Sequence, residues 1–268
     1  MTKGRLVFVG LGLYDEKDIS LKGLEEIKKS DKVYAEFYTA KLVGADIKKI
    51  EKTTGKSVRV LSRSETEKGD KILDSAKDRN VVFLTCGDPM TATTHVDLRL
   101  RASDKGIETK VIHGSSIVTA VPGLLGLQNY KFGRTTTLAF PEKNYFPTSP
   151  YEVIRDNRKM GLHTLVLLDI QADKNRFMTA NEGLDLLLDM EKKQKENVLC
   201  EDSLVCVVAR AGSDNPTIAA NSIAFLKKID FGPPLHTIVV PGNLHFMETE
   251  ALIRFAGLPS EPGKKCKD

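Results

Sequence analysis

The sequence predicts an α/β protein of two domains. Its 268 residues exceed the size of one average domain, and length alone indicates about two domains. Short apolar segments rich in Val, Ile, Leu and Phe alternate along the chain with segments of helical spacing, an order typical of an α/β architecture. Several of the apolar segments are continuous, as expected for strands that are buried on both faces of a sheet.

The apolar segments predict where the strands lie. Each is short and rich in Val, Ile, Leu or Phe. Between the first two segments, residues 20–30 place Leu21, Leu24 and Ile27 on one side of a helix, with charged residues elsewhere. The predicted strands are residues 5–9, 32–35, 58–61, 81–85, 109–112, 135–140, 164–168, 204–209 and 237–240.

Three short motifs predict where further helices begin. Thr94 with Asp97, and Thr179 with Glu182, have the spacing of a capping residue followed by an acidic residue. Residues 149–152, Ser-Pro-Tyr-Glu, combine a capping serine, a proline at the first helical position and an early glutamate. Helices are therefore expected after each of these positions.

The boundary between the two domains is placed at a change in composition. Alternation of strands and helices runs to residue 112, and residues 113–133 are then rich in glycine, as a domain junction often is. We therefore predict an N-terminal α/β domain at 1–112 and a C-terminal α/β domain at 113–268.

Composition excludes several classes of protein. Hydrophobic residues make up 41% and charged residues 28% of the chain, values of an ordinary globular protein rather than a collagen, a long coiled coil or a disordered chain. The formal net charge is +4, from 40 basic and 36 acidic residues, and most Lys and Arg stand near Asp or Glu. This pattern predicts a solvated surface and no direct contact with nucleic acid.

Cysteine spacing and the lack of long apolar runs favour a cytoplasmic protein. Cys86, Cys200, Cys206 and Cys266 form no C-x-x-C or other metal-binding spacing, so reduced thiols and no metal are expected. No apolar run approaches the roughly 18 residues of a membrane helix. The N-terminus lacks a small-residue cleavage site and runs into acidic residues, so a buried strand is predicted there rather than a signal peptide.

A glycine motif directly follows the first predicted strand. Gly10 and Gly12 allow a tight turn and a close approach of a ligand to the backbone. The third glycine of a dinucleotide-binding fingerprint is absent, because Asp15 stands in its place. Taken alone, the motif favours a structural turn over a binding loop.

The segment from Thr85 to His95 is a second candidate site. A Gly-Asp-Pro turn containing Asp88 follows a buried strand, and small or hydroxylated residues follow from Thr91 to Thr94. Ligands in open α/β sheets bind beyond the carboxyl ends of the strands, so Asp88 lies where a ligand is expected. The alternative is a turn aspartate that bonds its own backbone.

Further junctions of small residues occur in both halves of the chain and suggest a pocket built mostly from backbone. No Ser-His-Asp order, metal cluster or Walker loop is present. Asp88 or His95 could accept a proton, and the sequence assigns the catalytic role to neither of them nor to another residue. The junctions are residues 113–117, 165–170, 210–213 and 233–236.

Taken together, these segments resemble the diphthine synthase family. The likeness extends from about Leu6 to Gly257 with its motifs in order, and the variant Thr-Cys-Gly-Asp-Pro-Met at 85–90 is similar to the archaeal branch. The segments that carry it are residues 10–15, 18–19, 22–24, 35–39, 87–89, 92–95, 130–133, 161–164, 168–170, 178–182 and 209–213.

The resemblance implies a fold, a cofactor and a reaction. The family belongs to the tetrapyrrole-methylase-like class, in which two α/β domains hold S-adenosylmethionine in the cleft between them, usually in a homodimer. The implied substrate is translation elongation factor 2, on which a 3-amino-3-carboxypropyl histidine receives methyl groups on its amino group, up to trimethylation, giving diphthine. The cofactor-binding positions that the resemblance implies are Leu13, Asp88, Thr91, Ser116, Ile117, Leu168, Ala211 and His236.

Two other readings stay open. A methyltransferase of the same fold could act on a tetrapyrrole or on RNA, keeping the cofactor pocket and changing the acceptor. A non-enzymatic nucleotide-binding or scaffold module would use the same cleft without methyl transfer. The Ala-Thr-Thr-His sequence at 92–95 favours the methylation of elongation factor 2.

Overall fold

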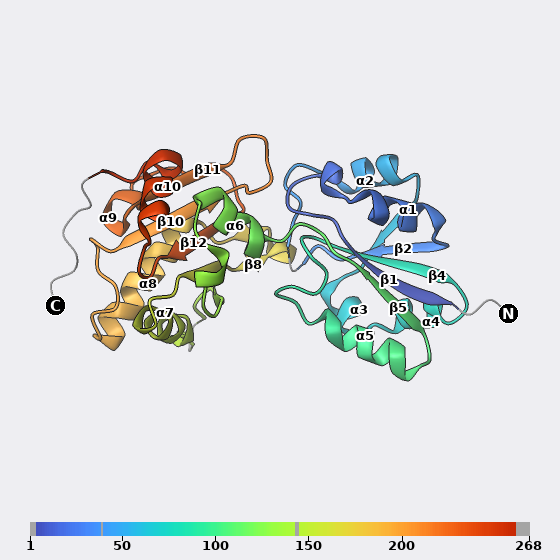
Figure 1. Cartoon of the computed structure of the whole chain (residues 1–268). Helices are drawn as coiled ribbons and strands as arrows, with labels where there is room; N and C mark the ends of the chain where they lie inside the picture. The colour runs from blue at the N-terminus through green and yellow to red at the C-terminus, as the bar shows by residue number, and fades with distance from the viewer. Residues whose placement is uncertain (1–3, 39, 143–144, 261–268) are drawn as a thin grey trace. The chain divides into compact units, whose positions relative to one another are not determined.

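The computed structural model describes residues 4–38, 40–142 and 145–260, and its chain divides into two compact units (Figure 1). Unit 1 comprises Met1–Ile117 and Gln171–Asn175, and unit 2 comprises Val118–Ile170 and Arg176–Asp268. Thr39, in one of the family-like motifs, lies outside the described residues. That 1–112 and 113–268 are separate domains stays a prediction.

Unit 1 is built on a parallel sheet of five strands in the order β3-β2-β4-β1-β5. Val82 in the central strand pairs with Val7 on one side and Val33 on the other. Because all pairings are parallel, the carboxyl ends of the strands meet at one edge of the sheet. The strands are β1 Arg5–Gly10, β2 Lys32–Ala35, β3 Val58–Val60, β4 Asn80–Thr85 and β5 Glu108–Ile112.

Helices cover both faces of this sheet. Leu6 and Phe8 belong to one hydrophobic cluster and Val7 and Val9 to another, because successive side chains of a strand point to opposite faces. Burial of each such side chain contributes about 1.5–3 kcal/mol. The helices of unit 1 are η1 Glu16–Asp18, α1 Leu21–Lys29, α2 Ile47–Thr54, α3 Arg63–Lys68, α4 Asp70–Ala76 and α5 His95–Asp104.

Unit 2 contains a mixed sheet of five strands in the order β11-β10-β12-β7-β6. The pairing of β6 with β7 is parallel, and the other pairings are antiparallel. A second, two-stranded sheet of β8 and β9 follows β7 in the chain. The strands are β6 Thr136–Leu138, β7 Thr164–Leu168, β8 Ile170–Gln171, β9 Arg176–Phe177, β10 Leu204–Ala209, β11 Thr217–Ser222 and β12 His236–Val240.

The core of unit 2 joins its sheet to the helices α7 and α8. Tyr151 of α7 and Leu184 and Leu187 of α8 lie in one cluster with Val166 and Ile238 of the sheet. This apolar contact packs α7 and α8 against the sheet. The helical segments that begin at the boundary or lie in unit 2 are α6 Ile117–Leu125, η2 Asn129–Lys131, α7 Ser149–Lys159, α8 Ala180–Gln194, α9 Ile223–Leu226 and α10 Phe246–Ala256; η3 Ala172–Lys174 belongs to unit 1.

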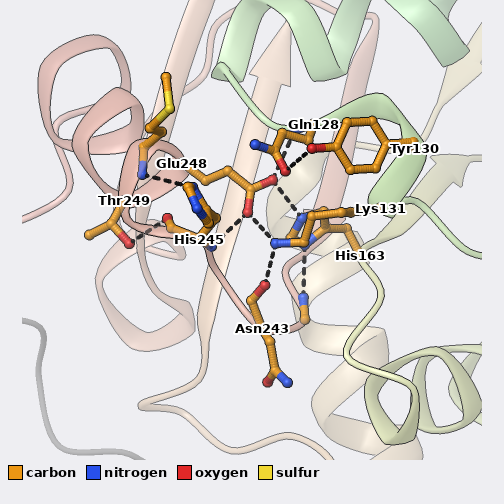
Figure 2. A network of polar contacts seen from close by, with 10 residues as sticks. Gln128, Tyr130, Lys131, His163, Asn243, His245, Glu248 and Thr249 are labelled. Carbon is orange, nitrogen blue, oxygen red and sulfur yellow. Dashed lines mark hydrogen bonds and ion pairs between the residues drawn. The ribbon is translucent and has the colours of Figure 1, made fainter.

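A buried carboxylate, Glu248, fastens the start of α10 to two other segments of unit 2 (Figure 2). It accepts hydrogen bonds from the backbone N–H groups of His245 (2.8 Å) and Gln128 (2.9 Å). The ammonium group of Lys131 and the Nε2 atom of His163 (3.0 Å) also contact it. Burial alone would raise the pKa of Glu248, but these hydrogen bonds outweigh it and lower the pKa to about 2.

The predicted strands are confirmed, and the prediction omits β11 and the two-residue strands β8 and β9. β11 was not predicted because its sequence, Thr-Ile-Ala-Ala-Asn-Ser, has no continuous run of large apolar residues. Its pairing with β10, from Leu204 opposite Ser222 to Ala209 opposite Thr217, makes it an edge strand. Pairing with a neighbouring strand thus stabilises a strand that its local composition does not indicate.

The helix starts predicted after Thr94 and Thr179 are confirmed, and the third start lies one residue from its predicted position. Thr179 forms the expected capping box, accepting from the backbone N–H of Glu182 at 3.2 Å while Glu182 accepts in return. α5 begins directly after Thr94, but the Thr94 side chain makes no capping bond. α7 begins at Ser149 with Thr148 as its cap, one residue earlier than predicted.

Three of the four cysteines, Cys86, Cys200 and Cys206, lie in the described part of the chain. Cys86 and Cys206 are free thiols, and burial raises the pKa of both. Cys200 takes part in a disulfide, so the expectation that all four thiols are reduced is wrong there; Cys266 lies outside the described residues. Within the described part of the chain, no helix has the length and apolar character needed to span a membrane.

Candidate functional site

Three loops of unit 1 meet beyond the carboxyl ends of β1, β4 and β5. A methyl group added at Gly10 or Gly114 would lie within 2.5 Å of the carbonyl oxygen of Gly87. The Gly87 N–H donates to the Gly12 carbonyl at 2.6 Å, and Gly87 has a left-handed φ of +67°. The glycines after β1 therefore serve close packing of loops, as the structural reading of that motif predicts.

Asp88 joins two of these loops through its carboxylate, which is 9% exposed. Its Oδ1 accepts from the backbone N–H of Met90 at 2.9 Å and from the hydroxyl of Thr91 at 3.3 Å. Its Oδ2 lies 2.7 Å from Nδ1 of His113. Asp88 is thus a turn aspartate that holds its own loop, and it also holds a side chain from the next strand end.

His113 is the first residue after β5, and its side chain is 75% exposed. Sequence reasoning placed it in a junction of small residues without a role. The signal that could have found it is its position directly after a strand, facing the loop of Asp88 from the neighbouring strand end.

A buried polar cluster lies beneath the loop that contains Asp88. His95 and Glu36 are buried, with Nε2 of His95 3.7 Å from Oε1 of Glu36, and Nδ1 of His95 lies 3.1 Å from the Pro89 carbonyl. Burial lowers the pKa of His95, while Glu36 and the Pro89 carbonyl oppose that shift. His95 therefore contacts the backbone of the loop at Pro89. Among the described residues, the buried hydroxyls of Thr85 and Thr93 and Nε2 of His95 have no hydrogen-bond partner.

The other predicted cofactor residues of unit 1 lie on the same loops. The backbone N–H of Leu13 donates to Oδ2 of Asp18 at 3.1 Å. Thr91 is bonded to Asp88, and Ser116 directly precedes α6, whose first residue is Ile117. Unit 1 thus gathers its predicted residues on the loops after β1, β4 and β5.

Unit 2 gathers its predicted cofactor residues at one edge of its sheet. Leu168 is the last residue of β7, Ala211 follows β10 closely, and His236 is the first residue of β12. β12 lies between β10 and β7 and is antiparallel to both, with His236 opposite Ala209. The three residues therefore approach the same edge although they are far apart in the sequence.

The ring of His236 is already engaged by the protein. The backbone N–H of Ala180 donates to its Nδ1 at 3.1 Å, and its Nε2 lies 3.2 Å and 3.1 Å from the carbonyls of Gly232 and Pro233. Burial lowers the pKa of His236, opposed by these two carbonyls. A neutral ring that donates from Nε2 satisfies every contact, so a cofactor would meet the backbone of His236 rather than its ring.

Each unit, taken by itself, has polar groups at its strand ends that suit a polar ligand such as S-adenosylmethionine. The hydroxyl oxygens of Thr93, next to the Asp88 loop, and of Ser213, after β10, are buried without a hydrogen-bond partner among the described residues. Such groups in a native protein call for a partner, and the carboxylate of Asp88 and backbone groups at strand ends add further acceptors and donors. Within the described residues, no group of acidic, His or Cys side chains could hold a metal ion.

The chain matches known proteins along most of its length. The family model for tetrapyrrole (corrin/porphyrin) methylases matches residues 5–226. A curated diphthine synthase of Methanococcus maripaludis is 58% identical over 92% of this chain and 97% of its own length, and one of Methanocaldococcus jannaschii is 55% identical over 92% and 97%. A crystal structure of diphthine synthase superposes with a TM-score of 0.87 at 42% identity, covering 95% of this chain and 97% of that one.

The fold and the strand-end loops thus define a methyltransferase of the tetrapyrrole methylase class. Within that class the chain belongs to the diphthine synthase family. The resemblance drawn from the sequence motifs is confirmed.

Proposed function

We propose that this chain is a diphthine synthase that acts in diphthamide biosynthesis. It transfers methyl groups from S-adenosylmethionine to the amino group of the 3-amino-3-carboxypropyl histidine of translation elongation factor 2, up to trimethylation. The observation that carries the proposal is the 58% identity to a diphthine synthase over nearly the whole of both chains. A match over 92% of the chain spans residues of both compact units.

We propose that the cofactor-binding positions are those that the family resemblance implies. In unit 1 the positions are Leu13, Asp88, Thr91, Ser116 and Ile117. When bound, S-adenosylmethionine supplies a methyl carbon made electrophilic by its positive sulfur. The residues of unit 2 proposed to contact it are Leu168, Ala211 and the backbone of His236.

The chain's own residues bind and orient rather than attack. The substrate amine is the nucleophile, so the protein needs no nucleophilic side chain of its own. Holding two reactants in line contributes several kcal/mol to the rate, and the glycine-packed loops of Gly10, Gly87 and Gly114 form a rigid base for this work. Asp88 fixes its loop through Met90 and Thr91, which keeps the binding groups in place.

The proposed partner is elongation factor 2, and the proposed location is the cytoplasm, where that factor acts. A homodimer is proposed from the resemblance to the family. No direct contact with nucleic acid is proposed, in line with the small net charge of +4.

Label transfer from methyl-tritiated S-adenosylmethionine tests the function. The acceptors are elongation factor 2 carrying the aminocarboxypropyl histidine and, in parallel, the unmodified factor. Label on the modified factor alone is expected, and mass spectrometry then counts the methyl groups. No label on either factor, with cofactor binding measured separately, would overturn the acceptor and favour a tetrapyrrole or an RNA.

A further inference from the structure

We propose that His113 is the general base of the reaction and that Asp88 orients it. The proposal rests on the proposed function, because it assigns the group that removes a proton from the substrate amine. No residue was assigned this role from the sequence.

The geometry of the pair is that of an oriented imidazole. Oδ2 of Asp88 lies 2.7 Å from Nδ1 of His113. A carboxylate only accepts hydrogen bonds, so Nδ1 carries the proton in this contact and Nε2 of the neutral ring is left as the acceptor. Asp88 is itself held by Met90 and Thr91, so the ring is fixed to an already rigid loop.

The position of His113 and Asp88 near proposed cofactor residues favours a role for His113 in proton transfer. His113 follows β5 directly, contacts Asp88 in the loop that also contains Thr91, and stands four residues before the start of α6 at Ile117 in the sequence. Both of these segments carry proposed cofactor positions. The imidazole therefore stands among the groups proposed to hold the methyl donor.

Each methyl transfer releases one proton, which needs an acceptor. The substrate ammonium gives a proton to Nε2 of His113, and its nitrogen then uses the freed electron pair to bond the methyl carbon. The sulfur–carbon bond of the donor breaks, and its electron pair stays on sulfur. The products are the methylated ammonium group, S-adenosylhomocysteine and protonated His113.

The exposure of His113 suits repeated transfer. At 75% exposure the ring can pass its proton to water and be ready for the next methyl group. The alternative base, His95, is 4% exposed, and its Nδ1 faces the Pro89 carbonyl. His163 and His236 are buried as well, with both ring nitrogens in contact with protein groups.

Two substitutions separate a base from a positioning residue. His113→Asn keeps an N–H donor near the position of Nδ1 and can still hold Asp88, but it has no basic nitrogen. His113→Ala removes both and leaves space for added imidazole. Glu108→Gln, an exposed change on the same strand, is the matched control.

For both His113 variants we expect kcat near neutral pH to fall by about 10²-fold, with the Kd of S-adenosylmethionine from calorimetry within about twofold of wild type. Added imidazole restores part of the kcat of His113→Ala, and Glu108→Gln behaves as wild type. Wild-type kcat in His113→Asn would overturn the proposal, as would a rise in Kd that accounts for the whole loss. A wild-type protein that labels no elongation factor 2 would instead overturn the proposed function, and this assignment with it.

Discussion

At the scale of single residues, Asp88 has a structural role in its loop and a proposed role in cofactor binding. Its carboxylate holds its own loop and His113, and it is also a proposed cofactor contact. We expect Asp88→Ala to weaken S-adenosylmethionine binding by about 10- to 100-fold, the effect of losing hydrogen bonds to a charged group, with the fold intact. Calorimetric titration measures the affinity, and circular dichroism checks the fold. Unchanged affinity would remove Asp88 from the cofactor site.

His236 presents the opposite case, a predicted site residue whose ring has a structural role. Its nitrogens contact Ala180, Gly232 and Pro233. His236→Ala therefore leaves the buried N–H of Ala180 unpaired and removes a donor to the other two carbonyls, of which that of Pro233 still accepts from Arg210. We expect the free energy of unfolding to fall by about 1–3 kcal/mol, measured by urea denaturation. If stability were unchanged while the cofactor Kd rose, the ring itself would be the cofactor contact.

At the scale of elements, the Glu248 network of Figure 2 fastens α10 to η2 and to the residue before β7. The folded-state pKa of about 2 lies below the ordinary value of 4.5. Since the pKa is lowered in the folded state, the stabilisation is complete above about pH 5 and is lost as pH falls towards 2. The difference corresponds to about 3 kcal/mol.

We therefore expect Glu248→Gln to be less stable than wild type near neutral pH and to lose less stability between about pH 5 and 2. Chemical denaturation at a series of pH values measures both effects. Glu250→Gln, an exposed change on the same helix, serves as control because a surface ion pair contributes little. Parallel pH curves for wild type and Glu248→Gln would show that another group carries the acid sensitivity.

For the molecule as a whole, ligand binding should appear as stability. A ligand that binds only the folded state adds about 2.7 kcal/mol at a concentration of 100 times its Kd. For a chain of this size that corresponds to a rise in Tm of roughly 5–10 °C. Differential scanning fluorimetry with S-adenosylmethionine measures the shift, and Asp88→Ala should show a smaller one at the same concentration. Equal shifts in the two proteins would contradict the role of Asp88.

Much of the fold could be predicted because its signals are local. Strands such as 32–35, 164–168 and 204–209 have the predicted bounds, since continuous runs of β-branched and aliphatic residues suit strands buried on both faces. The capping box of Thr179 and Glu182 likewise needs only residues close in sequence. β11 was missed because a strand of Ala, Asn and Ser forms only where β10 supplies its partner.

The sequence by itself determined the α/β class, the order of the elements, the family likeness and the loop of Asp88, because these follow from local composition and from motifs in order. Only the tertiary structure decided what the polar side chains contact. It joins Asp88 to His113 across two strand ends, and it occupies both nitrogens of His236. The physical reason is that a hydrogen bond between distant residues depends on sheet order and register, and a single sequence states neither of them.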